Sequence, residues 1–273
     1  MALIRVEGVS VAYGKPPHPV LADITLEIQE GSFVCVLGQT GCGKSTLLRL
    51  VLGAEQPNTG RILIDGREHR RPDRVCGYVP QKYSLFPDRT ALDNITFGPE
   101  ACEFGLFGRL RPRFYARRRA WRQEAFEYLV KTGLAPGDGH KYPDQLSGGM
   151  QQRVAIAQAL INKPRILLMD EAFSALDPGT RADMQHLIRT LWQATGTTIL
   201  FVTHNTQEAL SLGTRIVVLA REGSGGSRIM ADLDVPRPCE ESEIPRLVRR
   251  LEGVSRQRED RRELEYKAPL LDG

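Results

Sequence analysis

The 273-residue chain predicts an α/β fold with a mostly parallel β-sheet, an antiparallel β portion and an inserted helical subdomain. Three observations predict this fold. Short, unbroken apolar runs alternate with segments of helical periodicity, which is typical of parallel strands covered by helices on both faces. An apolar–polar alternation near the N-terminus predicts an antiparallel strand with one buried face. An arginine-rich stretch in the middle of the chain, followed by helical periodicity, predicts the inserted subdomain.

The antiparallel portion is predicted from the sequence VLADITLEIQ at residues 20–29. Ile24, Leu26 and Ile28 fall on one face of an extended strand, and the polar residues that alternate with them fall on the other. Later in the chain, a Gly/Ser cluster at 221–229 joins two strand-like runs and predicts a hairpin turn.

The parallel strands and the helices follow from the spacing of apolar residues. Unbroken apolar runs predict buried strands at residues 33–37, 166–169, 198–202 and 216–220. Periodic segments predict helices at residues 44–52, 149–162 and 179–195. Gly196 follows the last of these helices and is expected to stop it.

Domain boundaries are expected where the composition changes. Residues 1–236 are predicted to form one domain, with the helical subdomain inserted at about 98–157. Residues 237–273 are first Pro-rich and then densely charged, which is typical of a solvated helix or a disordered tail.

The composition argues against several classes of protein. Charged residues make up 26% of the chain, and no stretch approaches the roughly 18–20 consecutive apolar residues of a spanning helix. The start of the chain lacks the basic-then-apolar order of a secretory signal. A net charge of +4 gives little indication of nucleic-acid binding, and the five cysteines contain no C-x-x-C pair. We therefore expect a soluble, cytoplasmic protein with reduced thiols and no structural metal site.

The strongest local motif follows the apolar run 33–37 and opens the helix predicted at 44–52. It consists of Gly38, Gln39, Thr40, Gly41, Cys42, Gly43, Lys44, Ser45 and Thr46. Glycines allow backbone N–H groups to curl around phosphate oxygens, and the helix N-terminus adds partial positive charge. This spacing predicts a P-loop NTPase core, in which Lys44 reaches the β- and γ-phosphates of ATP and the Ser45 hydroxyl ligates Mg²⁺. A Gly-rich turn without a ligand is the alternative.

Cys42 lies inside this loop, beside Lys44 and a helix N-terminus. Both neighbours favour the thiolate, so a lowered thiol pKa is expected. The hypothesis that follows is inactivation by a thiol alkylator, protection by ATP and loss of sensitivity in Cys42→Ala. The alternative is that Cys42 is only a small residue that fits the loop.

Two adjacent carboxylates end one of the predicted strands. Asp170 and Glu171 directly follow the apolar run 166–169. Ligands of open α/β sheets bind at the carboxyl ends of strands, so both acids are expected beside the P-loop. Asp170 suits the Mg²⁺ shell, and Glu171 is free to polarise an attacking water. An ordinary polar strand end is the alternative.

A second helix N-terminus suited to anions is predicted at LSGGMQQR, residues 146–153. Ser147 is a typical N-cap, and Gly148 and Gly149 expose backbone N–H groups at the helix start. Capping alone would explain these three residues. The whole string, however, resembles the signature motif of the ABC ATPases.

Further motifs that resemble this family occur in order along residues 3–236. The resemblance implies that Tyr13, in VAYG, stacks on adenine. Gln81, in YVPQ, corresponds to the glutamine that senses Mg²⁺ and contacts the membrane partner. Asp177, in SALD, corresponds to the D-loop, and His204, in FVTHN, to the switch histidine that contacts the γ-phosphate. Each residue alone would more often be structural.

The resemblance also implies partners. In this family two ATPase subunits pair head to tail, so Ser147, Gly148 and Gly149 of one subunit act on the ATP held by the P-loop of the other. The sequence leaves open whether the two subunits are identical. The pair is expected to drive transmembrane permease subunits on the cytoplasmic face of the inner membrane, with a solute-binding protein as an indirect partner and without nucleic acid.

Within the family, several strings resemble the nitrate/sulfonate/taurine importer group, among them GQTGCGKSTLLRLVLG and TRADMQ. Two features depart from that group. Asn205 stands where an acid usually follows the histidine, and the segment 108–122, GRLRPRFYARRRAWR, makes the region before the signature longer and more basic. This segment is expected either to contact anionic lipid or an acidic permease loop, or to form a solvated helical face. An exporter ATPase, a non-transport ABC ATPase of DNA repair or translation, and an ATP-binding regulator are the alternatives.

Overall fold

The computed structural model describes residues 2–82, 84–104, 112–221, 223 and 225–236. The chain divides into two compact units, one formed by residues 1–71 and 201–273 and the other by residues 72–200. The tail expected at 237–273 lies outside the described residues.

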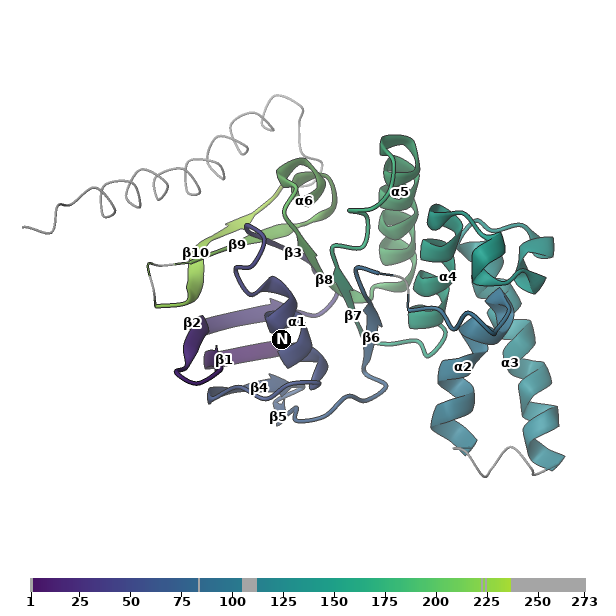
Figure 1. Cartoon of the computed structure of the whole chain (residues 1–273), viewed down its shortest axis with the longest axis horizontal. Helices are drawn as coiled ribbons and strands as arrows, with labels where there is room; N and C mark the ends of the chain where they lie inside the picture. The colour runs from purple at the N-terminus through teal and green to yellow at the C-terminus, as the bar shows by residue number, and fades with distance from the viewer. Residues whose placement is uncertain (1, 83, 105–111, 222, 224, 237–273) are drawn as a thin grey trace, which may run out of the picture. The chain divides into compact units, whose positions relative to one another are not determined.

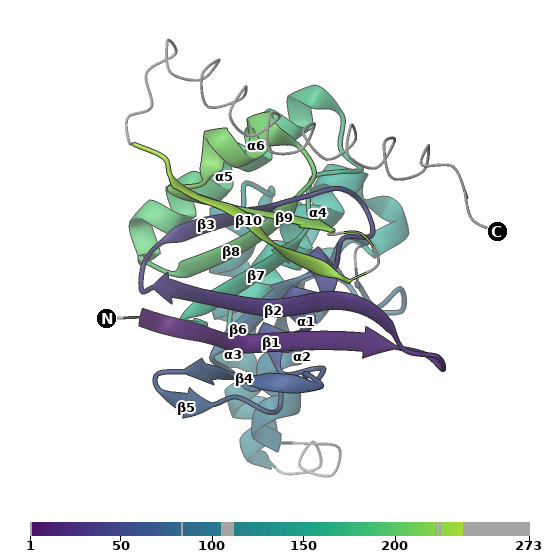
Figure 2. The same cartoon turned by 90° about the vertical axis from the view of Figure 1, so that its left-hand side faces the viewer.

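The first unit is built on a mixed sheet. Its strands are β1 (Ala2–Tyr13), β2 (His18–Gln29), β3 (Phe33–Leu37), β4 (Thr59–Ile64), β5 (Arg67–Glu68), β9 (Arg215–Arg221) and β10 (Ser227–Asp234). They lie in the order β5-β4-β1-β2-β10-β9-β3 (Figure 2). β1 pairs antiparallel with β2 and β4, whereas β9 pairs parallel with β3 and antiparallel with β10. Both parallel and antiparallel pairs are present, as the α/β prediction requires.

The burial of these strands confirms the patterns from which they were predicted. In β2, Ile24, Leu26 and Ile28 are buried, and the residues that alternate with them are exposed. Every residue of β3 is buried, which suits a strand covered on both faces. The antiparallel pairing of β9 with β10 confirms the hairpin predicted at 221–229.

Two helices of the described residues belong to the first unit. Helix α1 (Lys44–Leu52) has the predicted bounds and buries most of its apolar residues. Helix α6 (Thr206–Leu212) follows the strand β8 and was not predicted. It is a short helix, so its apolar period covers too few residues to be recognised in the sequence.

The second unit combines a parallel strand pair with a helical layer. Its elements are β6 (Cys76–Val79), α2 (Ala91–Phe104), α3 (Pro112–Lys131), α4 (Gly148–Leu160), β7 (Ile166–Asp170) and α5 (Pro178–Thr195), with short 3-10 helices at Pro136–His140 and Pro143–Gln145. β6 and β7 pair in parallel. Strand β8 (Thr198–Thr203) crosses from this unit to the other. The strands and helices predicted around 149–202 are therefore confirmed.

Helices α2, α3 and α4 lie side by side around a common core (Figure 1). The buried residues of this core are Ala91, Leu92, Ile95, Ala125, Leu129, Leu134, Leu146, Val154, Ala157 and Ile161. The first of these helices begins at Ala91, earlier than the start of about 98 expected for the subdomain. The Thr90 hydroxyl explains the early start, because it accepts the Asp93 N–H at 3.3 Å and donates to the Asp93 carboxylate at 2.9 Å.

In the part of the chain that the structure describes, no helix combines the length and the apolar character needed to span a membrane.

Candidate active site

The P-loop occupies the turn between β3 and α1 in the first unit. Gly41 and Gly43 adopt left-handed backbone conformations, with φ of 81° and 93°, which glycine adopts without a steric penalty. Gly43 is the N-cap of α1 and contributes no side-chain hydrogen bond to the helix. A Cβ at Gly38 would collide with the Leu219 carbonyl oxygen and lie 2.7 Å from Cys42 Sγ. The glycines therefore allow the loop its tight backbone course, and at Gly38 no side chain would fit.

Lys44 supplies the positive charge of this loop. Its side chain is only 4% exposed, and its ammonium donates to the carbonyl oxygens of Gly38 and Gln39 at 2.8 and 3.0 Å. These two bonds fold the ammonium back over the loop. Buried cations need such polar partners, and phosphate oxygens are stronger acceptors than carbonyls. The Lys44 ammonium therefore lies over the loop, in a position suited to binding a phosphate.

Cys42 lies in a less accessible place than the alkylation hypothesis requires. Its side chain is 5% exposed, with Sγ packed near Gly38. Reactive cysteines are partly exposed as well as close to positive charge, and only the second condition was readable from the sequence. The burial of Cys42 therefore favours the alternative in which it fills space in the loop. Among the described cysteines, Cys102 is the exposed one.

Tyr13 is the last residue of β1 and is 44% exposed. Its hydroxyl donates to Glu55 Oε2 at 2.5 Å, and Glu55 also accepts from Arg49. The hydroxyl is thus anchored while much of the ring stays open to solvent. An exposed, anchored ring of this kind can stack on a planar base.

His204 follows β8 and carries an exposed side chain. The next residue, Asn205, is the N-cap of α6, and its Oδ1 accepts the Glu208 N–H at 3.1 Å. Asn and Asp cap helices about equally well. The departure noted at Asn205 therefore preserves the capping function that an acid would have there.

The two predicted acids end β7 in the second unit. Asp170 is buried, and its Oδ2 lies 3.4 Å from the Tyr78 hydroxyl oxygen, a long hydrogen bond. Glu171 is half-buried in a left-handed backbone conformation, with φ of 43°. Its Oε2 accepts from Gln81 Nε2 at 3.2 Å. The structure therefore brings Gln81 to Glu171, the residue expected to activate water, and places a tyrosine that was not predicted next to Asp170.

The signature residues begin α4. Ser147 is its N-cap and accepts the Met150 N–H at 3.3 Å, as predicted from the sequence. Ser147 and Gly148 are exposed, so the N-terminus of the helix faces solvent in the single chain. A Cβ at Gly149 would lie 2.6 Å from Thr180 Cγ2, which explains why this position has no side chain.

Thr180 also links the signature to the D-loop residue. Asp177 is the N-cap of α5, and its Oδ1 accepts the Thr180 N–H at 3.1 Å. Hydrogen bonds from the side chain and the backbone of Thr180 lower the pKa of the Asp177 carboxyl group. Thr180 was not among the predicted residues. The D-P-G-T sequence, with Thr three residues after the cap, is the only sequence signal that could have indicated it.

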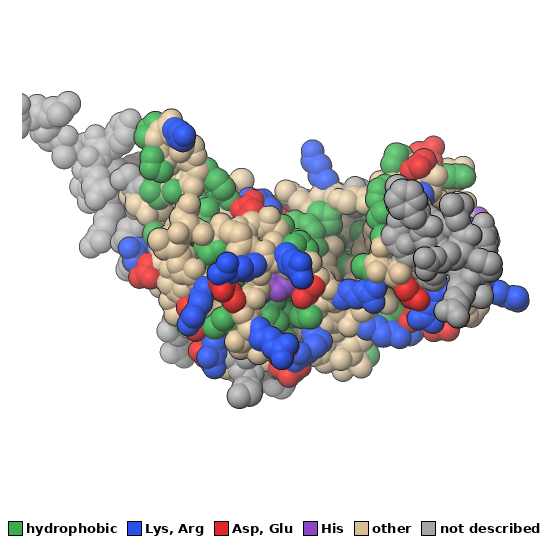
Figure 3. Space-filling model, turned by 90° about the horizontal axis from the view of Figure 1, so that it is seen from below, with side chains coloured by type: hydrophobic (Ala, Val, Ile, Leu, Met, Phe, Trp, Pro, Cys, Tyr) green, Lys and Arg blue, Asp and Glu red, His purple; other side chains and the backbone are tan. Residues whose placement is uncertain are grey.

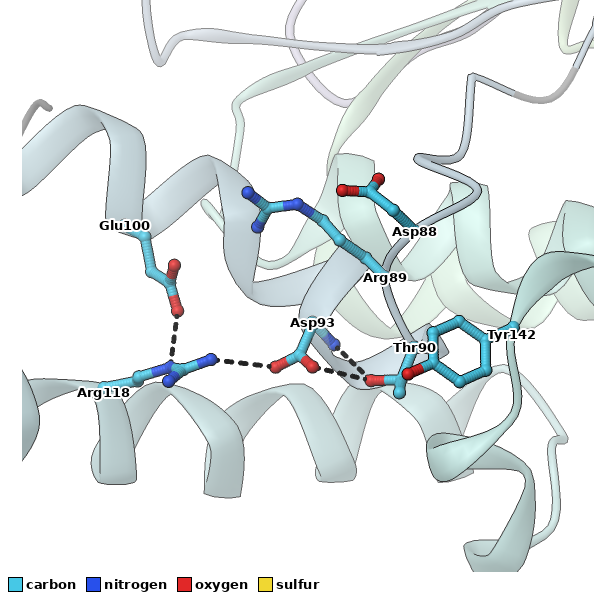
Figure 4. Close-up of a pocket in the computed structure, with 7 residues that line it drawn as sticks. All are labelled: Asp88, Arg89, Thr90, Asp93, Glu100, Arg118 and Tyr142. Carbon is cyan, nitrogen blue, oxygen red and sulfur yellow. Dashed lines mark hydrogen bonds and ion pairs between the residues drawn. The ribbon is translucent and has the colours of Figure 1, made fainter.

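The arginine-rich segment is partly neutralised within its own unit. Figure 4 shows Arg118 extending between Glu100 and Asp93, each at 3.2 Å. Arg122 also pairs with Asp93, at 3.3 Å, and Arg117 pairs with Glu103 at 3.3 Å. Three arginines of the described part of this segment are thus paired with acids of α2, and residues 108–111 lie outside the described residues. Basic and acidic side chains are likewise interspersed on the face seen in Figure 3.

A pocket of about 340 Å³ opens beside these ion pairs (Figure 4). Its lining residues are Asp88, Arg89, Thr90, Asp93, Glu100, Arg118 and Tyr142. The Arg89 guanidinium lies 4.7 Å from the centre of the Phe97 ring and 5.2 Å from that of Phe86. These contacts hold a cation among the residues that line the pocket.

Comparison with known proteins identifies relatives over most of the chain. Residues 21–174 match the family described as ABC transporter. The nitrate import ATP-binding protein NrtD of Synechococcus elongatus is 38% identical over 228 residues, which cover 84% of this chain and 79% of the relative. The aliphatic sulfonates import ATP-binding protein SsuB 3 of Pseudomonas syringae pv. tomato is 40% identical over 240 residues, which cover 86% and 78%.

A solved structure supports the same relationship. The dimeric, post-hydrolysis structure of an ATP-binding cassette bound to ADP and Pi is similar, with a TM-score of 0.71 and 31% sequence identity. The similarity covers 85% of this chain and 99% of that one.

Proposed function

The chain belongs to the ABC transporter family and is an ATPase coupled to transport, and on this basis we propose that it is the ATP-hydrolysing subunit of an importer. Relatives named for import of nitrate, sulfonate, sulfate/thiosulfate and spermidine/putrescine have identities of 38%, 40%, 42% and 44%, so identity does not single out a solute. We propose a small anionic solute of the nitrate/sulfonate/taurine kind from the strings that resemble that importer group. The observation that carries the proposal is that one chain holds a glycine-rich P-loop with Lys44, the acid pair at the end of β7, and a capped LSGG helix.

We propose that the P-loop binds the phosphates of ATP. Backbone N–H groups of the loop and of α1 donate to phosphate oxygens, and the Lys44 ammonium exchanges its loop carbonyls for the β- and γ-phosphates. Tyr13 offers its exposed ring to the adenine. Similarity to a cassette bound to ADP and Pi supports this assignment.

We propose that Ser45, Gln81 and Asp170 serve a Mg²⁺ ion that arrives with ATP. Among the described residues there is no group of three or more His, Cys, Asp or Glu side chains that could hold a metal alone. This fits Mg²⁺, which takes one or two protein carboxylates together with substrate phosphates and water. When bound, the ion neutralises the charge that develops on the phosphates during transfer.

Glu171 is proposed to orient and deprotonate the attacking water. Its carboxylate accepts from Gln81 Nε2 at 3.2 Å, so the glutamine holds the base in place. His204 is proposed to contact the γ-phosphate through its exposed imidazole. In this proposal Glu171 acts on the attacking water, and His204 acts on the phosphoryl group that is transferred.

We propose that the site is completed by a second subunit. The N-terminus of α4 is exposed, and its first turn carries backbone N–H groups suited to the terminal phosphate held by a partner. The dimeric form of the similar cassette supports this composite arrangement. Hydrolysis then depends on closure of the dimer, which completes the catalytic set.

The membrane partner is proposed to be a permease that docks on the helical layer of the second unit. The pocket beside Arg89 and Arg118 is a candidate surface, because it combines charged groups with an exposed tyrosine, Tyr142. In this proposal the subunit works on the cytoplasmic face of the membrane, and a solute-binding protein delivers the solute to the permease.

Glu171→Gln tests the proposal. Loss of the base should lower ATP hydrolysis by about 100-fold or more while ATP stays bound. The variant, captured from native membranes with ATP, should then recover a multi-span permease. Glu127→Gln, on the exposed face of α3, is the matched control and should hydrolyse normally. Rapid turnover in Glu171→Gln would refute the catalytic assignment, and recovery of ribosomes or DNA in place of a permease would refute the transport assignment.

A further inference from the structure

His204 lies in a stretch that is closed by three hydrogen bonds among its neighbours. The Thr203 hydroxyl donates to the Glu208 carboxylate at 2.5 Å. The Asn205 N–H donates to Thr203 Oγ1 at 3.0 Å, and the Glu208 N–H donates to Asn205 Oδ1 at 3.1 Å. We call Thr203, Asn205 and Glu208 the clamp. A hydroxyl can donate one bond and accept another, so Thr203 satisfies both of its roles in the clamp.

The clamp differs from ordinary helix capping. In a capping box, the acid three residues after the N-cap reaches back to the backbone N–H of the N-cap. Here Asn205 is the N-cap of α6, but the Glu208 carboxylate accepts from Thr203, and the Asn205 N–H also goes to Thr203. The Thr203 hydroxyl thus lies between the Glu208 carboxylate and the Asn205 N–H and bonds to both. It ties the last residue of β8 to the first turn of α6, with His204 held between them.

Burial makes these bonds strong. Thr203 is 2% exposed and Glu208 is 6% exposed, so the bond between them is shielded from water. A hydrogen bond to a carboxylate is stronger than one between neutral groups, and a buried carboxylate left without donors is costly. By contrast, the side chain of His204 is exposed. The clamp therefore fixes the backbone on both sides of an exposed residue.

We propose that Thr203 and Glu208 are positioning residues that hold the His204 backbone where its imidazole can meet the γ-phosphate. This inference rests on the proposed role of His204. Neither Thr203 nor Glu208 needs to touch the nucleotide, because both act through the histidine. Loss of the clamp should then lower the rate of hydrolysis and leave ATP affinity unchanged.

Thr203→Val removes the hydroxyl while keeping the shape of the side chain, and Thr203→Ser keeps the hydroxyl. For Thr203→Val we expect kcat to fall about tenfold, because a small misplacement of a reacting group lowers the rate by this order. The KM for ATP should stay unchanged. Thr203→Ser should keep most of the activity. The imidazole NMR signals of His204, assigned by their loss in His204→Ala, should shift in Thr203→Val without nucleotide. Thr132→Val is the matched control, because Thr132 is also buried with a bonded hydroxyl but belongs to the other unit.

The outcomes separate the clamp from the proposed function. If kcat and the His204 signals of Thr203→Val match those of Thr132→Val, the clamp is refuted. If His204→Ala keeps its full kcat, the role of the histidine in the proposed function is refuted, whatever the NMR signals show. Should Thr203→Val fail to fold, Glu208→Gln carries the same test. A neutral amide of the same size weakens the bond to Thr203, and an unchanged His204 signal in that variant would also refute the clamp.

Discussion

Helices α1 and α4 both begin at glycine-rich turns, yet their N-termini are prepared for anions in different ways. At α1 the N-cap is Gly43, which contributes no side chain to cap the helix. At α4 the hydroxyl of Ser147 accepts the Met150 N–H, so the helix satisfies one of its own donors. The first helix therefore lacks a side-chain cap, whereas the second has one.

The N-termini of α1 and α4 also differ in charge and in exposure to solvent. The P-loop carries a buried cation, Lys44, whereas the first turn of α4 contains only neutral residues and is open to solvent. A helix N-terminus with no cation of its own gives limited anion affinity. We therefore expect α1 to bind phosphate through its own loop, and α4 to suit an anion that is already held elsewhere. This is what the composite site of the proposed dimer requires.

The largest effect is expected at the cation. Lys44→Ala removes the only buried charge of the P-loop, so ATP hydrolysis should fall about 100-fold or more, as for removal of one preorganised donor to a developing charge. Binding of a fluorescent ATP analogue should weaken as well, since α1 is the primary site. Lys163→Ala is the control, because Lys163 pairs with Glu124 on the surface of the other unit. Normal ATP binding in Lys44→Ala would show that α1 does not need its cation.

The next effect separates capping from anion binding at α4. Ser147→Asp keeps an N-cap acceptor and favours the helix dipole, so the thermal unfolding temperature should be unchanged or slightly higher. Its negative charge would oppose the phosphates of a partner. Hydrolysis should therefore fall about 100-fold through a few kcal/mol of like-charge repulsion. Ser147→Asn, a neutral cap of similar strength, should keep most activity. Full hydrolysis by Ser147→Asp would contradict the difference drawn between the two helices.

The sequence predicted α1 and α4 because their motifs are local. A glycine spacing, a capping serine and an apolar period each lie within one short segment, so their consequences follow from nearest neighbours. The same holds for the fully buried strands β3 and β7. Each of these four elements, α1, α4, β3 and β7, was predicted from a pattern that lies within one short segment of the chain.

Contacts between segments that are distant in the chain could not be predicted from such local patterns. Thr180 meets Gly149 from another helix, and the ion pairs of Arg118 depend on how α2 packs on α3. The burial of Cys42 depends on its packing against Gly38 within the folded loop. A sequence gives the residues that have charge or reactivity, but their partners and exposure are decided by packing.

A smaller effect is expected where α4 meets α5. In Gly149→Ala the new Cβ would lie 2.6 Å from Thr180 Cγ2 and push against the cap of α5. We expect a loss of about 1–2 kcal/mol in the free energy of unfolding, as for modest overpacking, and about a fivefold loss of hydrolysis. Adding Thr180→Ser removes the methyl group and should restore most of both. Gly137→Ala is the control, since no atom lies within 4 Å of its added Cβ. Failure of Thr180→Ser to restore stability would show that this contact is not the constraint on Gly149.

The smallest effect concerns exposure and can be followed by thiol labelling. Ser147→Cys, in a background with Cys102→Ser and Cys239→Ser, should react rapidly with a maleimide because the N-cap of α4 is open to solvent. Cys42 should react slowly because it is 5% exposed. Burial raises the pKa of Cys76 to about 12, and since only the thiolate reacts, Cys76 should stay unlabelled at neutral pH.

ATP turns this labelling into a test of closure. With Glu171→Gln present to prevent hydrolysis, ATP should slow the labelling of Ser147→Cys, because the partner's nucleotide covers the start of α4. Cys42 should stay slow with or without ATP. Rapid labelling of Cys42 that ATP prevents would instead restore the hypothesis of a reactive P-loop thiol, and would show that the loop of α1 opens to solvent more than its burial indicates. An ATP-independent rate at Ser147→Cys would remove the reason for assigning α4 to a partner's nucleotide.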